Sequence, residues 1–182
     1  MFQALRSQAA LQRKASDIYG AIVTQARHPD FYGRLGVPDT PVGRYEMVVV
    51  HLFLVLERLR ADPLAADELA RALIETFVAD MDDAVREMGT GDVAVGKKVR
   101  RAAAGFYERS RDYRAGLATP DRQELVRALV RHAYAHENAD DHGEELASYV
   151  RVAGAALMRH DLAGAIAEPI AFPAPAAAVD LP

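Results

Sequence analysis

The chain has 182 residues and a formal net charge of −4 at pH 7, with 51% hydrophobic and 26% charged residues. This length suits one domain, which buries enough surface to fold without disulfides or a metal. The chain has no cysteine, and this excludes disulfide scaffolds, zinc–thiolate and iron–sulfur sites, and thiol nucleophiles.

No stretch of the sequence approaches the roughly 18 consecutive apolar residues of a membrane-spanning helix. The longest apolar run, residues 47–56, is interrupted by His51. Residues 1–16 carry Arg6, Arg13 and Lys14 and no acidic residue, a composition shared by transit peptides and amphipathic helices. We favour the start of a first helix and keep a mitochondrial transit peptide as the alternative.

Helical periodicity dominates, and no alternating pattern indicates a strand. We predict an all-α fold, a single compact domain of about six helices over residues 1–168. The expected helices cover about residues 5–26, 44–60, 62–88, 95–117, 121–136 and 141–160. The last segment, residues 169–182, is rich in proline and alanine. We expect it to be a flexible, extended tail with no packed core.

The helix over residues 44–60 is apolar on nearly every side, which predicts a buried central helix. His51 lies within it, and we interpret this lone histidine as a hydrogen-bonded core residue. The preceding connection is unusually apolar for a loop, and we expect it to pack against the body of the protein. Its apolar residues are Phe31, Tyr32, Leu35 and Val37.

Charge is distributed unevenly along the chain. Residues 61–92 contain nine acidic residues and two arginines, whereas residues 96–114 contain seven basic and two acidic residues. We favour the interpretation that these two segments form helices that lie side by side, with oppositely charged flanks that attract each other. The alternative is a basic face for an acidic partner such as ribosomal RNA or anionic lipid.

Residues 91–98 match the spacing of a phosphate-binding loop, G-x-x-x-x-G-K. That loop follows a strand and needs Ser or Thr after its lysine to hold magnesium. Here a predicted helix precedes it, and Lys98 occupies the hydroxyl position. We therefore interpret the segment as a turn between two helices.

Histidines and carboxylates form two further clusters. His132 and His136 lie one helical turn apart, near His142, a spacing that metal ligands on a helix use. A metal-dependent helical hydrolase using His132 and His136 is thus an alternative function, although we favour a solvated helix end. A second cluster alternates with core positions, which favours a solvated acidic face over a catalytic or cation site. Its members are Asp80, Asp82, Asp83 and Glu87.

The sequence also resembles the ubiquinol–cytochrome c chaperone family, clearly over residues 19–118 and weakly to about residue 160. The similarity rests on short pieces in a shared order and spacing. Two positions depart from the family pattern: Glu108 stands where glycine is usual, and Thr90 where an aliphatic residue is common. The matching pieces are Tyr19-Gly20-Ala21-Ile22-Val23, Gln25-Ala26-Arg27, Phe31-Tyr32, Val37-Pro38-Asp39-Thr40, Gly43-Arg44-Tyr45-Glu46-Met47, His51-Leu52, Asp80-Met81, residues 86–92, Val95, Lys97-Lys98-Val99, Phe106-Tyr107, Arg109 and Tyr113.

The resemblance implies a non-catalytic assembly factor for the cytochrome bc1 complex. Family members in mitochondria act on newly made cytochrome b at the ribosome exit, with a small partner subunit. The implied partner here is apo or nascent cytochrome b, with the ribosome surface and a small partner subunit as further options. The implied location is cytoplasmic, with peripheral contact at the inner membrane, or the mitochondrial matrix in a eukaryote. No catalytic residue, cofactor, metal or DNA partner is implied. A general protein-interaction module remains a third alternative.

Two sets of residues are candidates for partner binding. We expect Phe31, Tyr32, Leu35 and Val37 to border a groove for apolar segments, in the mode of a helix in a groove. We expect Lys97, Lys98, Arg100 and Arg101 to dock to ribosomal RNA or another acidic surface.

Overall fold

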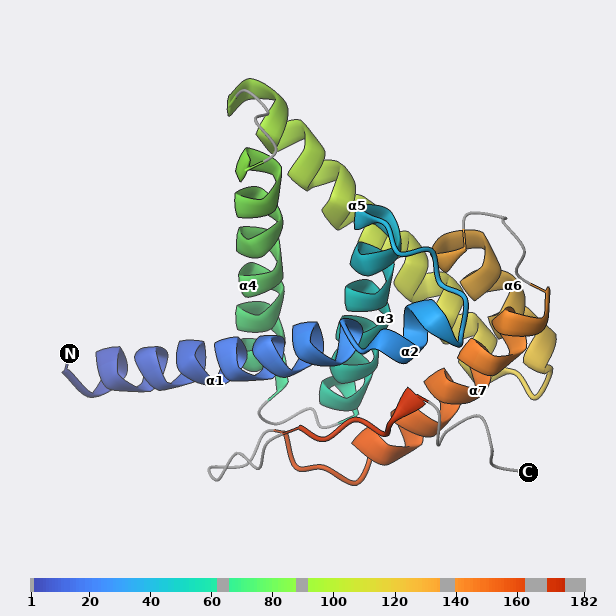
Figure 1. The fold of residues 1–182 in the computed structure, drawn as a ribbon. Helices are drawn as coiled ribbons and strands as arrows, with labels where there is room; N and C mark the ends of the chain where they lie inside the picture. Colours follow the sequence, from blue (N-terminus) through green and yellow to red (C-terminus); the bar gives the residue numbers. More distant parts are fainter. Residues whose placement is uncertain (1, 62–65, 88–91, 135–139, 163–169, 176–182) are drawn as a thin grey trace.

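The computed structural model describes residues 2–61, 66–87, 92–134, 140–162 and 170–175 (Figure 1). The described residues form seven helices and no strand, so the predicted all-α class is confirmed for this part of the chain. None of these helices is long and apolar enough to cross a membrane. The helices are α1 (Phe2–Ala26), α2 (Pro29–Gly33), α3 (Pro41–Arg60), α4 (Ala66–Glu87), α5 (Asp92–Ala118), α6 (Arg122–Ala133) and α7 (Asp140–Leu157).

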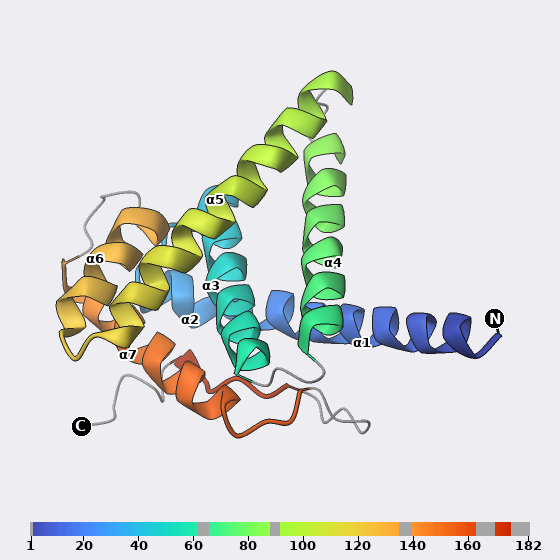
Figure 2. The same ribbon diagram turned by 180° about the vertical axis from the view of Figure 1, so that it is seen from behind.

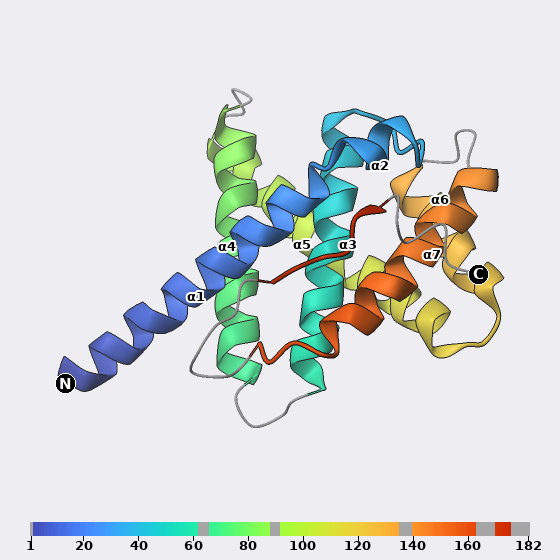
Figure 3. The same ribbon diagram turned by 60° about the horizontal axis from the view of Figure 1, so that its bottom comes forward.

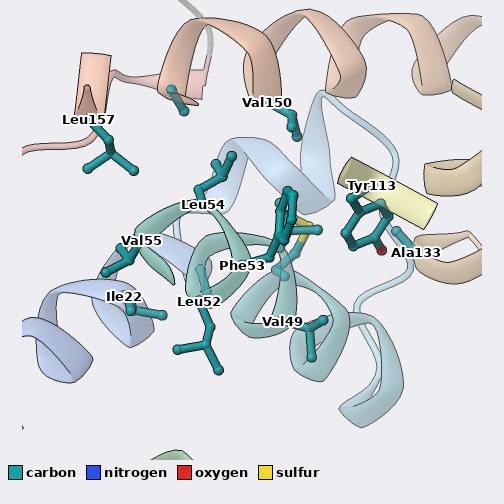
Figure 4. Packing of buried hydrophobic residues seen from close by; sticks show 14 of the residues in the cluster. Ile22, Val49, Leu52, Phe53, Leu54, Val55, Tyr113, Ala133, Val150 and Leu157 are labelled. Atoms are coloured by element: carbon teal, nitrogen blue, oxygen red, sulfur yellow. The ribbon is translucent and has the colours of Figure 1, made fainter. Parts of the chain in front are cut away.

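Helix α3 is the central element, as its apolar pattern predicts. It contacts α1, α4, α5, α6 and α7. Leu52, Phe53, Leu54 and Val55 follow one another along the chain and are all buried. Consecutive residues point to different sides of a helix, so α3 must be covered all round. Figure 4 shows side chains from several helices gathered around it.

Helices α4 and α5 contact each other, but they diverge from their connected ends, so side-by-side packing is limited to the part near those ends (Figures 1 and 2). In Figures 1 and 2 their connected ends project away from α3, and α1 crosses α4 near its other end. Two of the described arginines of α5 pair with α3, Arg109 with Glu46 and Arg114 with Glu57, whereas Arg111 pairs with Asp112 on α5 itself. These two ion pairs join α5 to α3, and the attraction between the charged flanks of α4 and α5 stays a prediction.

Side chains at the helix ends explain where two of the helices begin. The Thr40 hydroxyl accepts a hydrogen bond from the Gly43 amide at 3.1 Å, and Pro41 occupies the first helical position of α3. The Asp121 carboxylate accepts from the Gln123 amide at 2.9 Å and caps α6. Each cap satisfies an amide that has no partner within its own helix.

Helix α6 ends at Ala133, before the predicted end near His136. Tyr134 already departs from the helix. Its hydroxyl donates to the carbonyls of Leu35, at 2.6 Å, and His142, at 3.0 Å. These bonds hold a buried tyrosine where the chain leaves α6, and they explain the early end. His136 lies outside the described residues.

The connection between α1 and α3 packs into the core, as expected. It contains the additional helix α2, which the sequence analysis did not predict. Phe31, Leu35 and Val37 are buried, and Gly36 adopts a left-handed backbone with φ of 65°. A Cβ at Gly36 would lie 2.5 Å from the His142 ring, so both conformation and space favour glycine there.

The expectation of a tail without a packed core is wrong for residues 170–175. Ile170 and Phe172 pack against the hydrophobic core, and Pro175 is buried. In Figure 3 this segment, in red, crosses α3 between α1 and α7. Apolar side chains at positions 170 and 172 give the segment enough hydrophobic surface to pack despite its prolines. Residues 163–169 and 176–182 lie outside the described part.

Candidate partner-binding surfaces

A polar network inside the core links α1, α3, α7 and residues 170–175. The Nδ1–H of His51 donates to the Met47 carbonyl at 2.6 Å, and the Tyr149 hydroxyl donates to His51 Nε2 at 2.7 Å. Gln25 Nε2 donates to the Tyr149 oxygen at 3.1 Å and to the Pro173 carbonyl at 3.0 Å. Both ring nitrogens of His51 therefore have partners, and its predicted structural role is confirmed.

The network requires a neutral His51. Burial lowers its pKa to about 4, although the hydrogen bond to Met47 acts in the opposite direction. Aromatic rings complete the enclosure: Phe31 and Phe172 meet the imidazole edge-on, at centroid distances of 5.3 and 5.0 Å. Phe31 also packs edge-on against Tyr149, at 4.9 Å.

The residues predicted to border an apolar groove lie beside this network. Phe31, Leu35 and Val37 are buried in the core, so a partner reaches them only if the connection moves. Tyr32 is partly buried, and its hydroxyl donates to the Ala26 carbonyl at 2.6 Å. Within this set, Tyr32 is the residue that keeps exposed surface. The partner-binding role of the set stays a prediction.

The second predicted set lies on the first part of α5. Lys97, Lys98, Arg100 and Arg101 belong to this helix, but their side chains lie outside the described part of the structure. Because α5 begins at Asp92, the predicted turn over residues 91–98 is helical from that position on. Helical amides bond within the helix beyond its first turn, so residues 92–98 do not form a phosphate-cradling loop.

Glu46 and Arg109 form a buried ion pair between α3 and α5. Arg109 Nε donates to Glu46 Oε2 at 2.7 Å and Nη2 donates to Oε1 at 2.5 Å. The Arg109 guanidinium also lies over the Tyr45 ring, 5.9 Å from its centroid. Burial raises the pKa of Tyr45 to about 12, and Arg109 partly opposes this rise. All three residues belong to the sequence pieces on which the family resemblance rests.

His132, one of the two histidines of the metal alternative, is engaged by a carboxylate. Its Nε2 lies 3.0 Å from Asp112 Oδ2, and its ring packs edge-on against Tyr113. Burial alone would raise the pKa of Asp112, but the hydrogen bonds from His132 and Arg111 lower it overall. Among the described residues, no group of three or more His, Asp or Glu side chains is placed to hold a metal ion.

The residues of the acidic cluster on α4 have different surroundings. Asp80 accepts a hydrogen bond of 2.8 Å from the Tyr19 hydroxyl on α1, whereas Asp83 is exposed. Burial and this bond to Asp80 raise the pKa of Tyr19. Asp80 thus helps to join α1 and α4. The Glu87 side chain lies outside the described part.

The structure also shows a groove that no prediction from the sequence includes. It has a volume of about 320 Å³ and lies between α3, α5 and α7. The small residues Gly154 and Ala155 leave room for it, and Met158 at its rim is 54% exposed. The lining residues come from three segments that are far apart in the sequence, so no local pattern predicts the groove. They are Leu54, Glu57, Arg58, Leu117, Arg151, Gly154, Ala155 and Met158.

Two arginines of this groove are held by main-chain carbonyls. Arg58 Nε donates to the His160 carbonyl at 2.8 Å, and Arg151 Nη2 donates to the Gly116 carbonyl at 3.0 Å. The single carboxylate of the lining, Glu57, accepts from Arg114 at 2.6 Å. The groove lining therefore combines apolar side chains with two arginines and one paired carboxylate.

Comparison with known proteins identifies one protein family, and the match covers most of the fold. The family model described as ubiquinol-cytochrome C chaperone matches residues 33–172. The ubiquinol-cytochrome-c reductase complex assembly factor 1 of Xenopus laevis is 24% identical over 136 residues, covering 74% of this chain and 67% of the relative. The crystal structure of the Cbp3 homolog from Brucella abortus is similar with a TM-score of 0.79 and 34% sequence identity, covering 91% of this chain and 94% of that chain.

The family match extends from the end of α2 to Phe172, so it includes the Glu46–Arg109 pair, most of the His51 network and the groove. It covers well over half of the chain, and the solved structure agrees in both sequence and fold. The chain therefore belongs to the ubiquinol-cytochrome C chaperone family.

Proposed function

We propose that the protein is a non-catalytic assembly factor for the cytochrome bc1 complex and that it binds newly made cytochrome b. The observation that carries this proposal is the family match across residues 33–172. The similar protein from Xenopus laevis is named as an assembly factor of the ubiquinol-cytochrome-c reductase complex. Binding of a membrane subunit before its insertion requires a surface for apolar segments.

The groove between α3, α5 and α7 is the described surface that best suits such a client. Leu54, Leu117 and Met158 offer apolar contacts, and the exposed Met158 side chain can adapt to different neighbours. Arg58 and Arg151 favour a client segment that carries an acidic side chain near its apolar residues. Tyr32 and the apolar connection around it form a second proposed contact.

The basic first part of α5 is the proposed dock for the ribosome or another acidic surface. Lys97, Lys98, Arg100 and Arg101 place four positive charges within little more than one helical turn. Such a cluster attracts phosphate groups, and the attraction weakens as salt rises. A cytoplasmic or matrix location with peripheral contact at the inner membrane, and a small partner subunit, complete the proposal.

Deletion of the gene tests the assembly role. Reduced-minus-oxidised spectra of the membranes should lose the cytochrome b signal while other cytochromes remain, and bc1 activity should fall. The intact gene should restore both. Normal spectra and normal bc1 activity in the deletion strain would contradict the proposal.

Charge reversal tests the basic dock separately. Replacement of the four basic residues by glutamate should abolish co-sedimentation with ribosomes or membranes at physiological salt. Arg111→Glu, at an exposed position later on the same helix, is the matched control and should keep most of the binding. Equal co-sedimentation of the fourfold variant and the unchanged chain would remove this part of the proposal.

A further inference from the structure

Residues 170–175 lie across α3 as a strip between α1 and α7 (Figure 3). Ile170 and Phe172 are partly buried against the core, whereas Ala171 and Ala174 are exposed. Residues 170–174 have no regular secondary structure. The strip therefore presents some side chains to the body of the protein and others to solvent, as a bound peptide does.

The surface beneath the strip contacts the main chain of the strip and the aromatic ring of Phe172. Gln25 Nε2 donates to the carbonyl of Pro173 at 3.0 Å. A bond to a main-chain carbonyl is available from any extended peptide, whatever its side chains. The Tyr149 hydroxyl accepts from the same Gln25 amide at 3.1 Å and is itself held by His51, so the amide is oriented by contacts that do not involve the strip.

The Phe172 ring meets the His51 imidazole edge-on at 5.0 Å, with the planes at 88°. Phe31 packs against the same imidazole and against Tyr149, which makes the cradle aromatic. Such edge-to-face geometry favours an aromatic side chain at the position of Phe172. The cradle thus combines a main-chain contact with an aromatic contact, and Ile170 adds apolar packing.

The strip makes fewer hydrogen bonds than the helices do. Of the hydrogen bonds found among the described residues, one joins residues 170–175 to the rest of the chain. Pro173 and Pro175 lack an amide hydrogen and cannot donate. Segments with few apolar contacts and few hydrogen bonds open at a lower free-energy cost than the core.

We propose that the surface beneath residues 170–175, where Gln25 and His51 contact the strip and Phe31 and Tyr149 support them, is a binding site for an extended apolar peptide segment with an aromatic residue at the position of Phe172. The chain's own strip occupies this site and competes with a partner segment. The proposal concerns peptide binding and holds or fails independently of the role of cytochrome b. It also differs from the groove between α3, α5 and α7, which lies outside the strip's contacts.

A labelled peptide of residues 170–175, Ile-Ala-Phe-Pro-Ala-Pro, is the probe, with fluorescence anisotropy as the measurement. A chain that ends at residue 169 should bind it saturably, and the full chain should bind it at least about tenfold more weakly because its own strip competes. A peptide with alanine in place of Phe172 should bind the shortened chain about tenfold more weakly, because most of its aromatic contact is lost. A shortened chain that keeps its helical circular dichroism but shows no saturable binding would overturn the proposal.

The Gln25 contact is tested in the same shortened chain. Gln25→Leu should lower the affinity for the peptide about fivefold, which is the usual net effect of one hydrogen bond. Gln12→Leu is the matched control, because Gln12 lies on the same helix and its amide donates instead to Thr76. Equal affinities of the two variants would show that the main-chain contact does not contribute.

A variant of the full chain decides the matter if the shortened chain does not fold. Phe172→Ala leaves the rest of the chain unchanged but removes the aromatic contact of the strip. The strip should therefore leave its site more readily. This variant should bind the labelled peptide at least about fivefold more tightly than the unchanged chain. Ala171→Ser, at an exposed position of the strip, should leave the affinity unchanged. Equal peptide affinity of Phe172→Ala and the unchanged chain would overturn the proposal.

Discussion

Glu46 on α3 and Arg109 on α5 join the two helices by paired hydrogen bonds of 2.5 and 2.7 Å. The Glu46 side chain is only 1% exposed, whereas that of Arg109 is 21% exposed. The arginine therefore supplies the charge that makes a buried carboxylate tolerable. The pair fixes the position of α5 against the central helix.

Arg109→Leu should lower the free energy of unfolding by about 3–5 kcal/mol, because Glu46 would keep a buried charge without its partner. Urea denaturation followed by circular dichroism measures this change. Arg111→Leu is the control: the Arg111 side chain is 73% exposed, and its pair with Asp112 should contribute less than about 1 kcal/mol. Equal losses in the two variants would contradict the assigned role of the buried pair.

The double variant Glu46→Leu with Arg109→Leu should recover part of the stability that Arg109→Leu loses. Removal of both charges leaves two apolar side chains at a buried contact, with no carboxylate to desolvate. Unfolding of the single and double variants in one denaturant series checks this. A double variant less stable than both single variants would indicate that packing, not charge, decides the outcome.

His51 should make the protein less stable in mild acid. Its pKa is lowered to about 4 in the fold, whereas an unfolded histidine has a pKa near 6.5. As pH falls between these values, the unfolded chain binds a proton that the folded chain does not, so stability is lost. Between pH 7.5 and pH 5 this amounts to about 2 kcal/mol.

The measurement is the difference in unfolding free energy between pH 7.5 and pH 5, compared between variants. In His51→Leu this difference should be smaller by about 2 kcal/mol than in the unchanged chain. If His51→Leu loses as much stability at pH 5 as the unchanged chain, His51 is not the group that titrates.

Gly36→Ala should destabilise the fold by more than about 1–2 kcal/mol, the cost of a left-handed conformation for a residue with a Cβ. The added cost comes from the His142 ring, which the new methyl group would meet at 2.5 Å. In a His142→Ala background the cost should fall to the conformational part alone. Thermal unfolding of the four chains measures the coupling.

Gly33→Ala serves as the control for Gly36, since a Cβ at Gly33 meets nothing within 4 Å and its φ is not positive. It should leave stability nearly unchanged. A Gly36→Ala cost that is the same with and without the His142 ring would remove the steric contribution and leave only the backbone conformation.

Met158→Asp should reduce the capture of cytochrome b by the tagged protein from membranes. The side chain is 54% exposed, so stability should change by no more than about 0.5 kcal/mol, while the charge disturbs an apolar wall of the groove. Val42→Asp, at a 62% exposed position outside the groove lining, is the control. Equal capture by both variants would indicate that cytochrome b does not use this groove.

Much of the fold followed from local patterns. The all-round apolar helix identified α3 as the central element, and the spacing of apolar residues placed the other long helices to within a few residues. The burial of the apolar connection and the structural role of His51 were also predicted. These predictions succeed because hydrophobic periodicity reports how a helix meets its neighbours without specifying which neighbours they are.

Other features depended on residues that are far apart in the chain. The early end of α6 depends on bonds from Tyr134 to Leu35 and His142, and neither partner can be identified from the residues around Tyr134. The sequence predicts a tail over residues 170–175 because the prolines of this segment interrupt any helix. Its packing became visible only when α1, α3 and α7 were placed around it.

The sequence by itself determined the helical class, the central helix, the absence of thiol chemistry and the resemblance to a chaperone family. Tertiary structure alone decided that Glu46 meets Arg109, that three helices border a groove, and that residues 170–175 occupy an aromatic cradle. The physical reason is the range of each effect. Periodicity and capping act within a few residues of the chain, whereas ion pairs, grooves and cradles arise from side chains that only the packed helices bring together.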